Sequence, residues 1–122
     1  MKQTKRSRPL AVPTLFVSIP STQADRMESA LREKGLSVTR ADNVCVAEMY
    51  AEGQRFEAAI YDQSLSQEEQ VSLARVMRIR WPWMRIIRFV SPGAPLLDDS
   101  LFDCSAHSES QLTACVEHSL AG

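Results

Sequence analysis

The chain has 122 residues, a length typical of one domain with a single hydrophobic core. Hydrophobic residues make up 44% and charged residues 24%, the balance of an ordinary globular domain. The net charge of −1 argues against a dedicated nucleic-acid binder, whose surface is basic. No apolar run approaches the length of a membrane span.

The first residues of the chain differ in character from the rest. Residues 1–12 carry four basic side chains and almost no apolar mass, so we interpret them as a flexible tail before a domain at 13–122. The basic start is not followed by the apolar segment of a signal peptide, and we therefore expect a cytoplasmic protein. The three cysteines lack metal-ligand spacing, which predicts reduced, mostly buried thiols at Cys45, Cys104 and Cys115.

The first third of the domain predicts a strand, a helix and a second strand. The stretch at 13–19 is an apolar run after Pro13 and is typical of a strand. The segment 20–35 predicts a helix that Gly35 ends, and the alternating pattern at 36–41 predicts a half-exposed strand. Four apolar residues of the helix recur at helical spacing: Ala24, Met27, Ala30 and Leu31.

The middle of the chain continues this alternation. A short helix is expected at 43–53 and a buried strand at 57–62. The next helix, 66–81, opens with Ser66 and has Glu69 three residues later, the pattern of a capping box.

The last third predicts strands at 85–91 and 100–105 and a closing helix at 108–120. Strands that alternate with helices predict a parallel sheet covered on both faces. We therefore expect an α/β fold of the flavodoxin-like, doubly wound type, with five strands in the order 2-1-3-4-5.

The order and spacing of four stretches carry a resemblance to a known family. They read TLFVSIPSTQADRMESALREKGLSVTRADN at 14–43, FEAAIYDQSLS at 56–66, MRIIRFVSP at 84–92 and SESQLTACVEHSL at 108–120. Together, residues 13–120 resemble the receiver domain of bacterial response regulators. The resemblance implies that Asp62 stands at the phosphoacceptor position and Ser91 at the position of the switch hydroxyl.

Two departures from the family pattern concern the chemistry at Asp62. The resemblance implies an acidic pair that helps to hold Mg²⁺, but Ser18 and Ile19 occupy those positions. Mg²⁺ prefers carboxylate and phosphate oxygens, so these residues make a poor site, and no cofactor is expected. The lysine that the resemblance implies at the end of the fifth strand falls at Ser105, or at its neighbours Cys104 or Ala106, and none of these is a cation.

A third departure is a short connection between the last two strands. Residues 91–100 contain two prolines and a glycine, whereas a parallel crossover normally needs about ten to twelve residues or more, mostly helical. We expect the fourth helix of the family to be short or absent. The apolar residues near this gap, together with two tryptophans, predict a homodimer: Leu96, Leu97, Leu101, Phe102, Trp81 and Trp83.

Several other side chains are candidate sites. The arginines and tryptophans at 75–88 could bind phosphates and stack on bases, but they are more simply cations near a helix end and aromatic residues that pack. Arg88 could replace the missing lysine if its side chain pointed to Asp62. A solvated role is favoured for His107, His118 and the Asp98–Asp99 pair.

Three functions follow, in order of preference. The first is a stand-alone receiver-like module that acts by protein–protein contact with a histidine kinase or an output protein, without phosphorylation. The second is an atypical response regulator that is phosphorylated on Asp62. The third is a small flavodoxin-like enzyme, ranked last because the chain lacks a glycine-rich phosphate loop, a nucleophile elbow and an acid–base pair.

Overall fold

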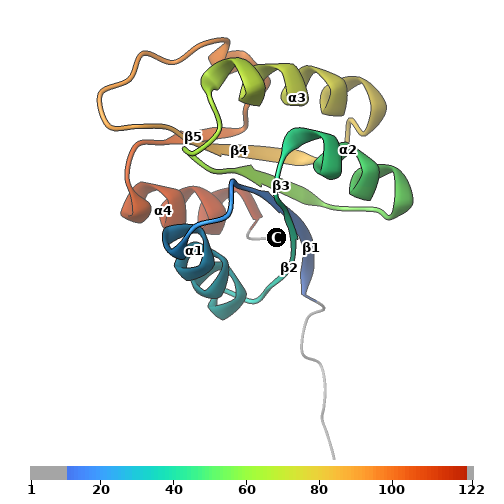
Figure 1. Cartoon of the computed structure of the whole chain (residues 1–122), viewed down its shortest axis with the longest axis horizontal. Coiled ribbons are helices and arrows are strands. Elements are labelled where there is room, and N and C mark those ends of the chain that lie inside the picture. Colours follow the sequence, from blue (N-terminus) through green and yellow to red (C-terminus); the bar gives the residue numbers. More distant parts are fainter. Residues whose placement is uncertain (1–10, 121–122) are drawn as a thin grey trace, which may run out of the picture.

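A parallel five-stranded sheet forms the centre of the molecule, with helices on both of its faces (Figure 1). This computed structural model describes residues 11–120, so most of the predicted 1–12 tail lies outside the described residues. The elements in chain order are β1 (Val12–Val17), α1 (Thr22–Glu33), β2 (Leu36–Ala41), α2 (Val44–Gly53), β3 (Ala58–Tyr61), α3 (Gln67–Arg80), β4 (Arg85–Phe89), the 3-10 turn η2 (Asp99–Leu101), β5 (Cys104–Ala106) and α4 (Glu109–Leu120).

The strand order is β2-β1-β3-β4-β5, and every neighbouring pair is parallel. The predicted fold class is therefore confirmed. Alternate strand residues point to opposite faces, and both faces are apolar, as expected of a parallel sheet. Leu15 packs in the core beneath α2 and α3, whereas Phe16 packs in the core beneath α1 and α4.

The predicted helix starts are formed by side-chain caps. The hydroxyl of Ser21 accepts a hydrogen bond from the backbone N–H of Ala24 at the start of α1. At α3, Ser66 and Glu69 form the predicted capping box, in which each side chain accepts from the other residue's backbone N–H. None of the helices within residues 11–120 combines the length and apolar content needed to cross a membrane.

The connection between β4 and β5 contains the 3-10 turn η2 in place of a fourth family helix, as predicted. We call residues 91–101 the β4–β5 loop. The loop is fixed along α3 by two arginines of that helix: Arg75 pairs with Asp98 at 2.8 Å, and Arg78 donates to the carbonyl of Leu101 at 2.9 Å. The basic residues of α3 therefore stabilise the segment that replaces a helix.

Gln67, the first residue of α3, holds the middle of the loop. Its Nε2 donates to the carbonyl of Pro95 at 2.7 Å, and its Oε1 accepts from the backbone N–H of Leu97 at 2.9 Å. The two bonds lie on either side of Leu96. The side-chain amide of Gln67 thus pairs with one backbone carbonyl and one backbone N–H, as a neighbouring strand would in a sheet.

Arg88 of β4 binds the β4–β5 loop from the sheet. This residue of β4 is fully buried, and its Nη1 donates to the carbonyl of Leu97 at 2.8 Å. Its guanidinium pairs with Asp99 at 3.2 Å and lies 4.0 Å from the ring centroid of Phe102. Phe102 is itself buried, so the chain's own loop covers part of the gap that motivated the homodimer prediction, and Leu96 and Leu97 remain exposed.

The prediction of three reduced thiols is wrong for two of them. Cys104 in β5 and Cys115 in α4 form a disulfide, with a Cα–Cα distance of 5.9 Å. The sequence separation of 11 residues did not indicate the pair, because it depends on how α4 packs against the edge strand. Cys45 is a free thiol, but it is exposed rather than buried.

Candidate functional site

Asp62 follows β3 directly, at the edge where all five parallel strands end. Folds of this type bind ligands at that edge. The backbone N–H of Asp62 donates to the carbonyl of Val17 at 2.9 Å, which extends the pairing of β3 with β1 by one residue. The Asp62 side chain is 8% exposed, so its carboxylate needs partners within the protein.

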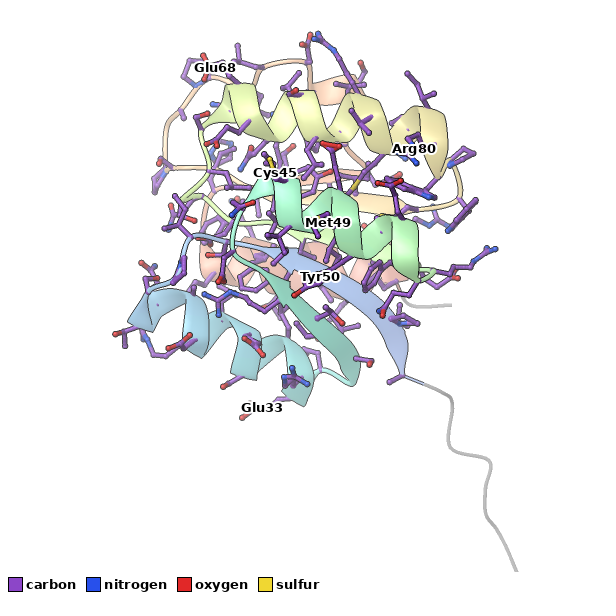
Figure 2. The ribbon with its side chains drawn as sticks, turned by 45° about the vertical axis from the view of Figure 1, so that its right-hand side comes forward. Glu33, Cys45, Met49, Tyr50, Glu68 and Arg80 are labelled. Carbon is purple, nitrogen blue, oxygen red and sulfur yellow. A yellow bond between two sulfur atoms is a disulfide. The ribbon has the colours of Figure 1, made fainter. Side chains whose placement is uncertain are left out.

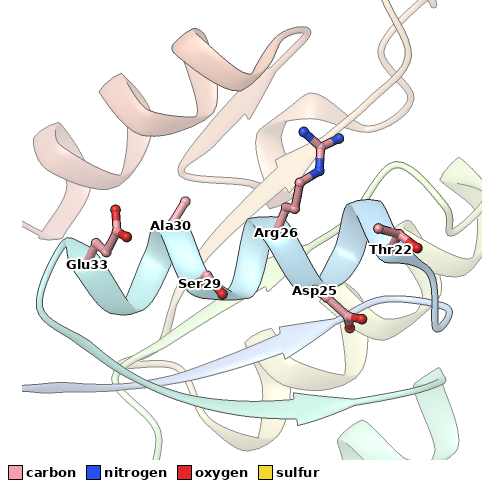
Figure 3. Close-up of a pocket in the computed structure, with 6 residues that line it drawn as sticks. All are labelled: Thr22, Asp25, Arg26, Ser29, Ala30 and Glu33. Carbon is pink, nitrogen blue, oxygen red and sulfur yellow. The ribbon is translucent and has the colours of Figure 1, made fainter.

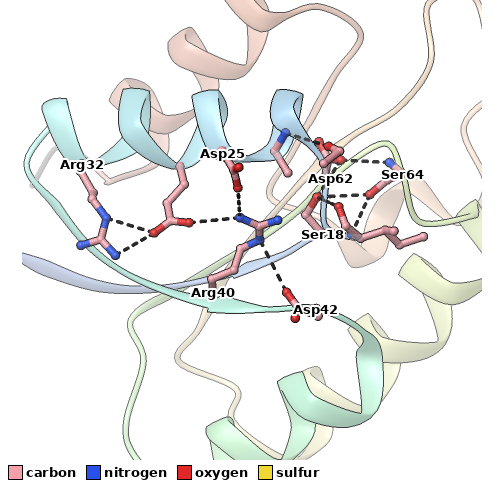
Figure 4. A network of polar contacts seen from close by, with 11 residues as sticks. Ser18, Asp25, Arg32, Arg40, Asp42, Asp62 and Ser64 are labelled. Atoms are coloured by element: carbon pink, nitrogen blue, oxygen red, sulfur yellow. Dashed lines mark hydrogen bonds and ion pairs between the residues drawn. The ribbon is translucent and has the colours of Figure 1, made fainter.

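Two serines supply those partners (Figure 4). Oδ2 of Asp62 accepts from the hydroxyl of Ser18 at 3.0 Å and from the backbone N–H of Ser64 at 3.1 Å. The hydroxyl of Ser64 lies 3.3 Å from that of Ser18 and accepts from the backbone N–H of Ile19 at 3.1 Å. The four residues form a closed polar network, which we call the Asp62 network.

Ser64 was missed by the sequence interpretation. The signal was present in the order Asp-x-Ser after a buried strand, because an aspartate often accepts from the backbone N–H two residues later. The turn that follows β3 is therefore stabilised by the same carboxylate that the family resemblance assigns to phosphorylation.

Gln70 is a second residue that the sequence did not single out. It is fully buried in α3, and its Nε2 donates to the carbonyls of Asp62 at 3.1 Å and Phe89 at 3.0 Å. This one amide joins the ends of β3 and β4. Its Oε1 has no partner among the described residues.

The predicted site residues are only partly brought together. Ser18 and Ile19 lie beside Asp62, as the resemblance implies. The hydroxyl of Ser105 instead accepts from Nε of Arg88 at 2.9 Å and donates to Asp99 at 2.8 Å. Since Arg88 also binds the β4–β5 loop, it does not supply a cation to the Asp62 network in place of the missing lysine.

Ser91 follows β4 and is exposed. Its carbonyl accepts from the backbone N–H of Ala94 at 3.1 Å, and Nδ1 of His107 lies 3.3 Å from the same carbonyl. His118 is exposed on α4. The structure thus gives His107 a contact at the strand ends and leaves His118 in solvent.

The residues at the family's metal position do not fit Mg²⁺. Asp62 provides one carboxylate, which is already hydrogen-bonded, and the Ile19 side chain is apolar. Within residues 11–120, no three His, Cys, Asp or Glu side chains gather into a possible metal site. A hard cation needs more oxygen ligands than this arrangement offers.

An ion-pair network lies next to the Asp62 network in Figure 4. Arg40 of β2 pairs with Asp25 and Glu28 of α1, each at 3.1 Å, and lies 4.0 Å from Asp42. Hydrogen bonding by Arg32, more than by Arg40, lowers the pKa of Glu28 against the opposing effect of burial. These ion pairs join β2 to α1, and the opposite charges neutralise one another.

Two hollows at the surface of the described residues lie away from Asp62. One of about 310 Å³ is open and lies on α1 (Figure 3), lined by Thr22, Asp25, Arg26, Ser29, Ala30 and Glu33. Another of about 240 Å³ lies between α2 and α3, lined by Val44, Glu48, Glu68, Glu69, Ser72 and Leu73. Neither lining includes Asp62, Ser91 or Ser105.

The arginine-rich segment is largely used inside the molecule. Among the described residues, four of its five arginines form ion pairs: Arg75 with Asp98, Arg78 with Asp103, Arg80 with Glu52 and Arg88 with Asp99. This favours the packing interpretation over a nucleic-acid surface.

No protein-family model and no curated protein matches the chain. Solved structures do match. A receiver domain (CheY-like) from Methylobacillus flagellatus has a TM-score of 0.75 and 16% identity, over 91% of this chain and 97% of that one. The receiver domain of a sensor histidine kinase from Pseudomonas aeruginosa PAO1, with a magnesium ion coordinated in its active site cleft, has a TM-score of 0.73 and 20% identity, over 92% and 99%.

A third match is the signal receiver domain of an HD domain-containing protein from Pseudomonas fluorescens Pf-5, with a TM-score of 0.76 and 14% identity, over 91% and 95%. The chain therefore has the fold of response-regulator receiver domains. At these identities the likeness concerns the fold, and it confirms the predicted resemblance at that level.

Proposed function

We propose that this chain is a receiver-like signalling module that acts by protein–protein contact and is not phosphorylated on Asp62. The observation that carries the proposal is the Asp62 network. In the receiver fold, this position needs a cation to neutralise the charge on the transferred phosphoryl group. Here the carboxylate accepts hydrogen bonds from Ser18 and Ser64 instead.

The surroundings of Asp62 support the same conclusion. Ser105, at the position that the resemblance assigns to a lysine, is engaged with Arg88 and Asp99. The β4–β5 loop replaces the helix that changes in a phosphorylated receiver, and Gln67 and Arg88 hold it by direct hydrogen bonds. A module whose β4–β5 loop is held by these hydrogen bonds presents one fixed surface to its partner.

Incubation with acetyl phosphate and Mg²⁺, followed by intact-mass measurement, tests the proposal. We expect no mass gain in the wild type and none in Asp62→Asn, the matched control. A mass gain of one phosphoryl group that disappears in Asp62→Asn would favour the atypical response regulator instead.

The proposed partner is a histidine kinase or an output protein, and the proposed location is the cytoplasm. The Cys104–Cys115 disulfide makes the location testable, because cytosolic proteins are kept reduced. The structure contains this disulfide, so a cytoplasmic location requires that the bond be reduced in the cell, and alkylation of a rapidly quenched cell extract, read by mass, should then find free thiols at both positions. A protected disulfide there would argue for an oxidising compartment.

A further inference from the structure

Two exposed apolar groups lie at opposite ends of α3. Leu96 and Leu97, 38% and 43% exposed, lie beside the N-terminal end, where Gln67 binds the loop. Ile79 and Trp83, 81% and 41% exposed, lie at or just beyond the C-terminal end. Figure 2 marks these two ends with Glu68 and Arg80. The 14-residue helix separates the two groups by about 20 Å.

The leucine tip, Leu96 and Leu97, has a fixed backbone and free side chains. Gln67 pairs with the carbonyl of Pro95 and the N–H of Leu97, and the buried Arg88 binds the carbonyl of Leu97. A loop that is already ordered loses little conformational entropy on binding, so it can use its apolar area for affinity.

The surface around the leucine tip is acidic. Glu68 is exposed on the first turn of α3 and has no ion pair to a described residue, and the side chains of Asp98 and Asp99 are 51% and 60% exposed. Arg75 pairs with Asp98 and the buried Arg88 pairs with Asp99, so these two pairs are balanced, and Glu68 supplies the uncompensated negative charge. The tip therefore fits an apolar surface with basic neighbours.

The opposite end of α3 has that composition, and we call it the arginine–tryptophan end. The guanidinium of Arg55 lies 4.2 Å from the ring centroid of Trp83, and that of Arg80 lies 4.7 Å from the ring centroid of Trp81. The indole N–H of Trp83 donates to the carbonyl of Phe56 at 3.0 Å, which fixes the ring. Arginine and tryptophan are the residue types that carry most binding energy at protein interfaces.

The arginine–tryptophan end has a net positive charge. Arg55 pairs with Glu57 at 2.9 Å and Arg80 with Glu52 at 3.0 Å, so these pairs are balanced. Arg85 is exposed and has no ion pair within residues 11–120. It supplies the uncompensated positive charge.

We propose that the leucine tip of one copy of this chain docks on the arginine–tryptophan end of a second copy. The two surfaces are complementary in charge, both are apolar at their centres, and they lie at opposite ends of one helix. Such a contact is heterologous, so it extends into a head-to-tail chain or closes into a ring. The inference goes beyond the proposed function and does not depend on the phosphorylation state of Asp62.

Mixing two blocked variants tests this contact. Leu97→Glu removes the tip and keeps the other end, whereas Trp83→Glu does the reverse. Sedimentation equilibrium should show species larger than a dimer in the wild type, monomers for each variant alone, and a dimer in an equimolar mixture. Met49→Glu, on the exposed face of α2, is the matched control and should assemble as the wild type does.

Three results would overturn the contact: a monomeric wild type at high micromolar concentration, a mixture that stays monomeric, or equal loss of assembly in Met49→Glu. A mixture that stays monomeric would point to a symmetric interface. In that case both variants carry a blocked surface, and neither can complement the other. If Trp83→Glu fails to show a cooperative unfolding transition, Arg85→Glu replaces it. Raised salt should also weaken assembly, since the attraction is between exposed charges.

Discussion

The hydroxyl of Ser18 donates a hydrogen bond of 3.0 Å to Oδ2 of Asp62, within the protein interior. The receiver resemblance implies a carboxylate where Ser18 stands. Two carboxylates at this distance would repel each other and favour a bound cation, whereas a hydroxyl stabilises the single carboxylate without one. Under the proposed function, this replacement turns a position that the resemblance assigns to phosphoryl chemistry into one held by a structural hydrogen bond.

Asp62→Asn should change the free energy of unfolding by less than about 1 kcal/mol, because the amide oxygen can accept the same two hydrogen bonds. Asp62→Ala should cost about 1–3 kcal/mol, since it leaves the buried hydroxyl of Ser18 and the N–H of Ser64 without this partner. Urea unfolding of both variants measures the difference. Equal stabilities would mean that the Asp62 network does not stabilise the fold.

Asp99 should matter more to stability than its neighbour Asp98. Asp99→Asn leaves the fully buried Arg88 without its carboxylate, and we expect a loss of about 1–2 kcal/mol, below the range of about 3–5 kcal/mol for fully buried pairs because Asp99 is itself exposed. Asp98 pairs with the exposed Arg75, so Asp98→Asn should cost less than about 1 kcal/mol. The reverse ranking in denaturant unfolding would contradict the role given to Arg88.

The disulfide should stabilise the closing helix. Cys115→Ser opens a short covalent loop between β5 and α4, and we expect a loss of about 2–3 kcal/mol under oxidising conditions. Under a reducing agent, the wild type should fall to nearly the same stability as the variant. A wild type that does not respond to the reducing agent would show that the bond is not formed in solution.

Glu28 should contribute to acid sensitivity. Its pKa is lowered, chiefly by the hydrogen bond from Arg32, so the folded state favours the ionised carboxylate. The resulting stability is present above the ordinary pKa of 4.5 and is lost as the pH falls through the lower folded-state value. Glu28→Gln should therefore lose less stability than the wild type on acidification. Glu33→Gln on the same helix is the control and should follow the wild type.

The fold could be predicted because its signals are local. Apolar runs marked the strands, the Ser66–Glu69 capping box marked α3, and two prolines with a glycine marked the loss of a helix between β4 and β5. Each of these depends on residues close together in the sequence.

The contacts that define the site are not local, and most of them were missed. Ser18 and Ser64 are 46 residues apart. Arg88 meets Ser105 through the register of β4 with β5, and it meets Leu97 and Asp99 through the path of the β4–β5 loop. The Cys104–Cys115 pair likewise depends on helix packing. Residue types could therefore show what the Asp62 position lacks, but not what replaces it.

The most direct measurement is a titration with Mg²⁺ and beryllium fluoride, which mimics a phosphoryl group, followed by the backbone amide shifts of Ile19, Asp62 and Ser64. We expect no saturable shift at these amides, because the Asp62 carboxylate already accepts from Ser18 and Ser64, and Ser18 stands where the resemblance implies a second carboxylate. A saturable shift that requires both reagents and disappears in Asp62→Asn would contradict the proposed function.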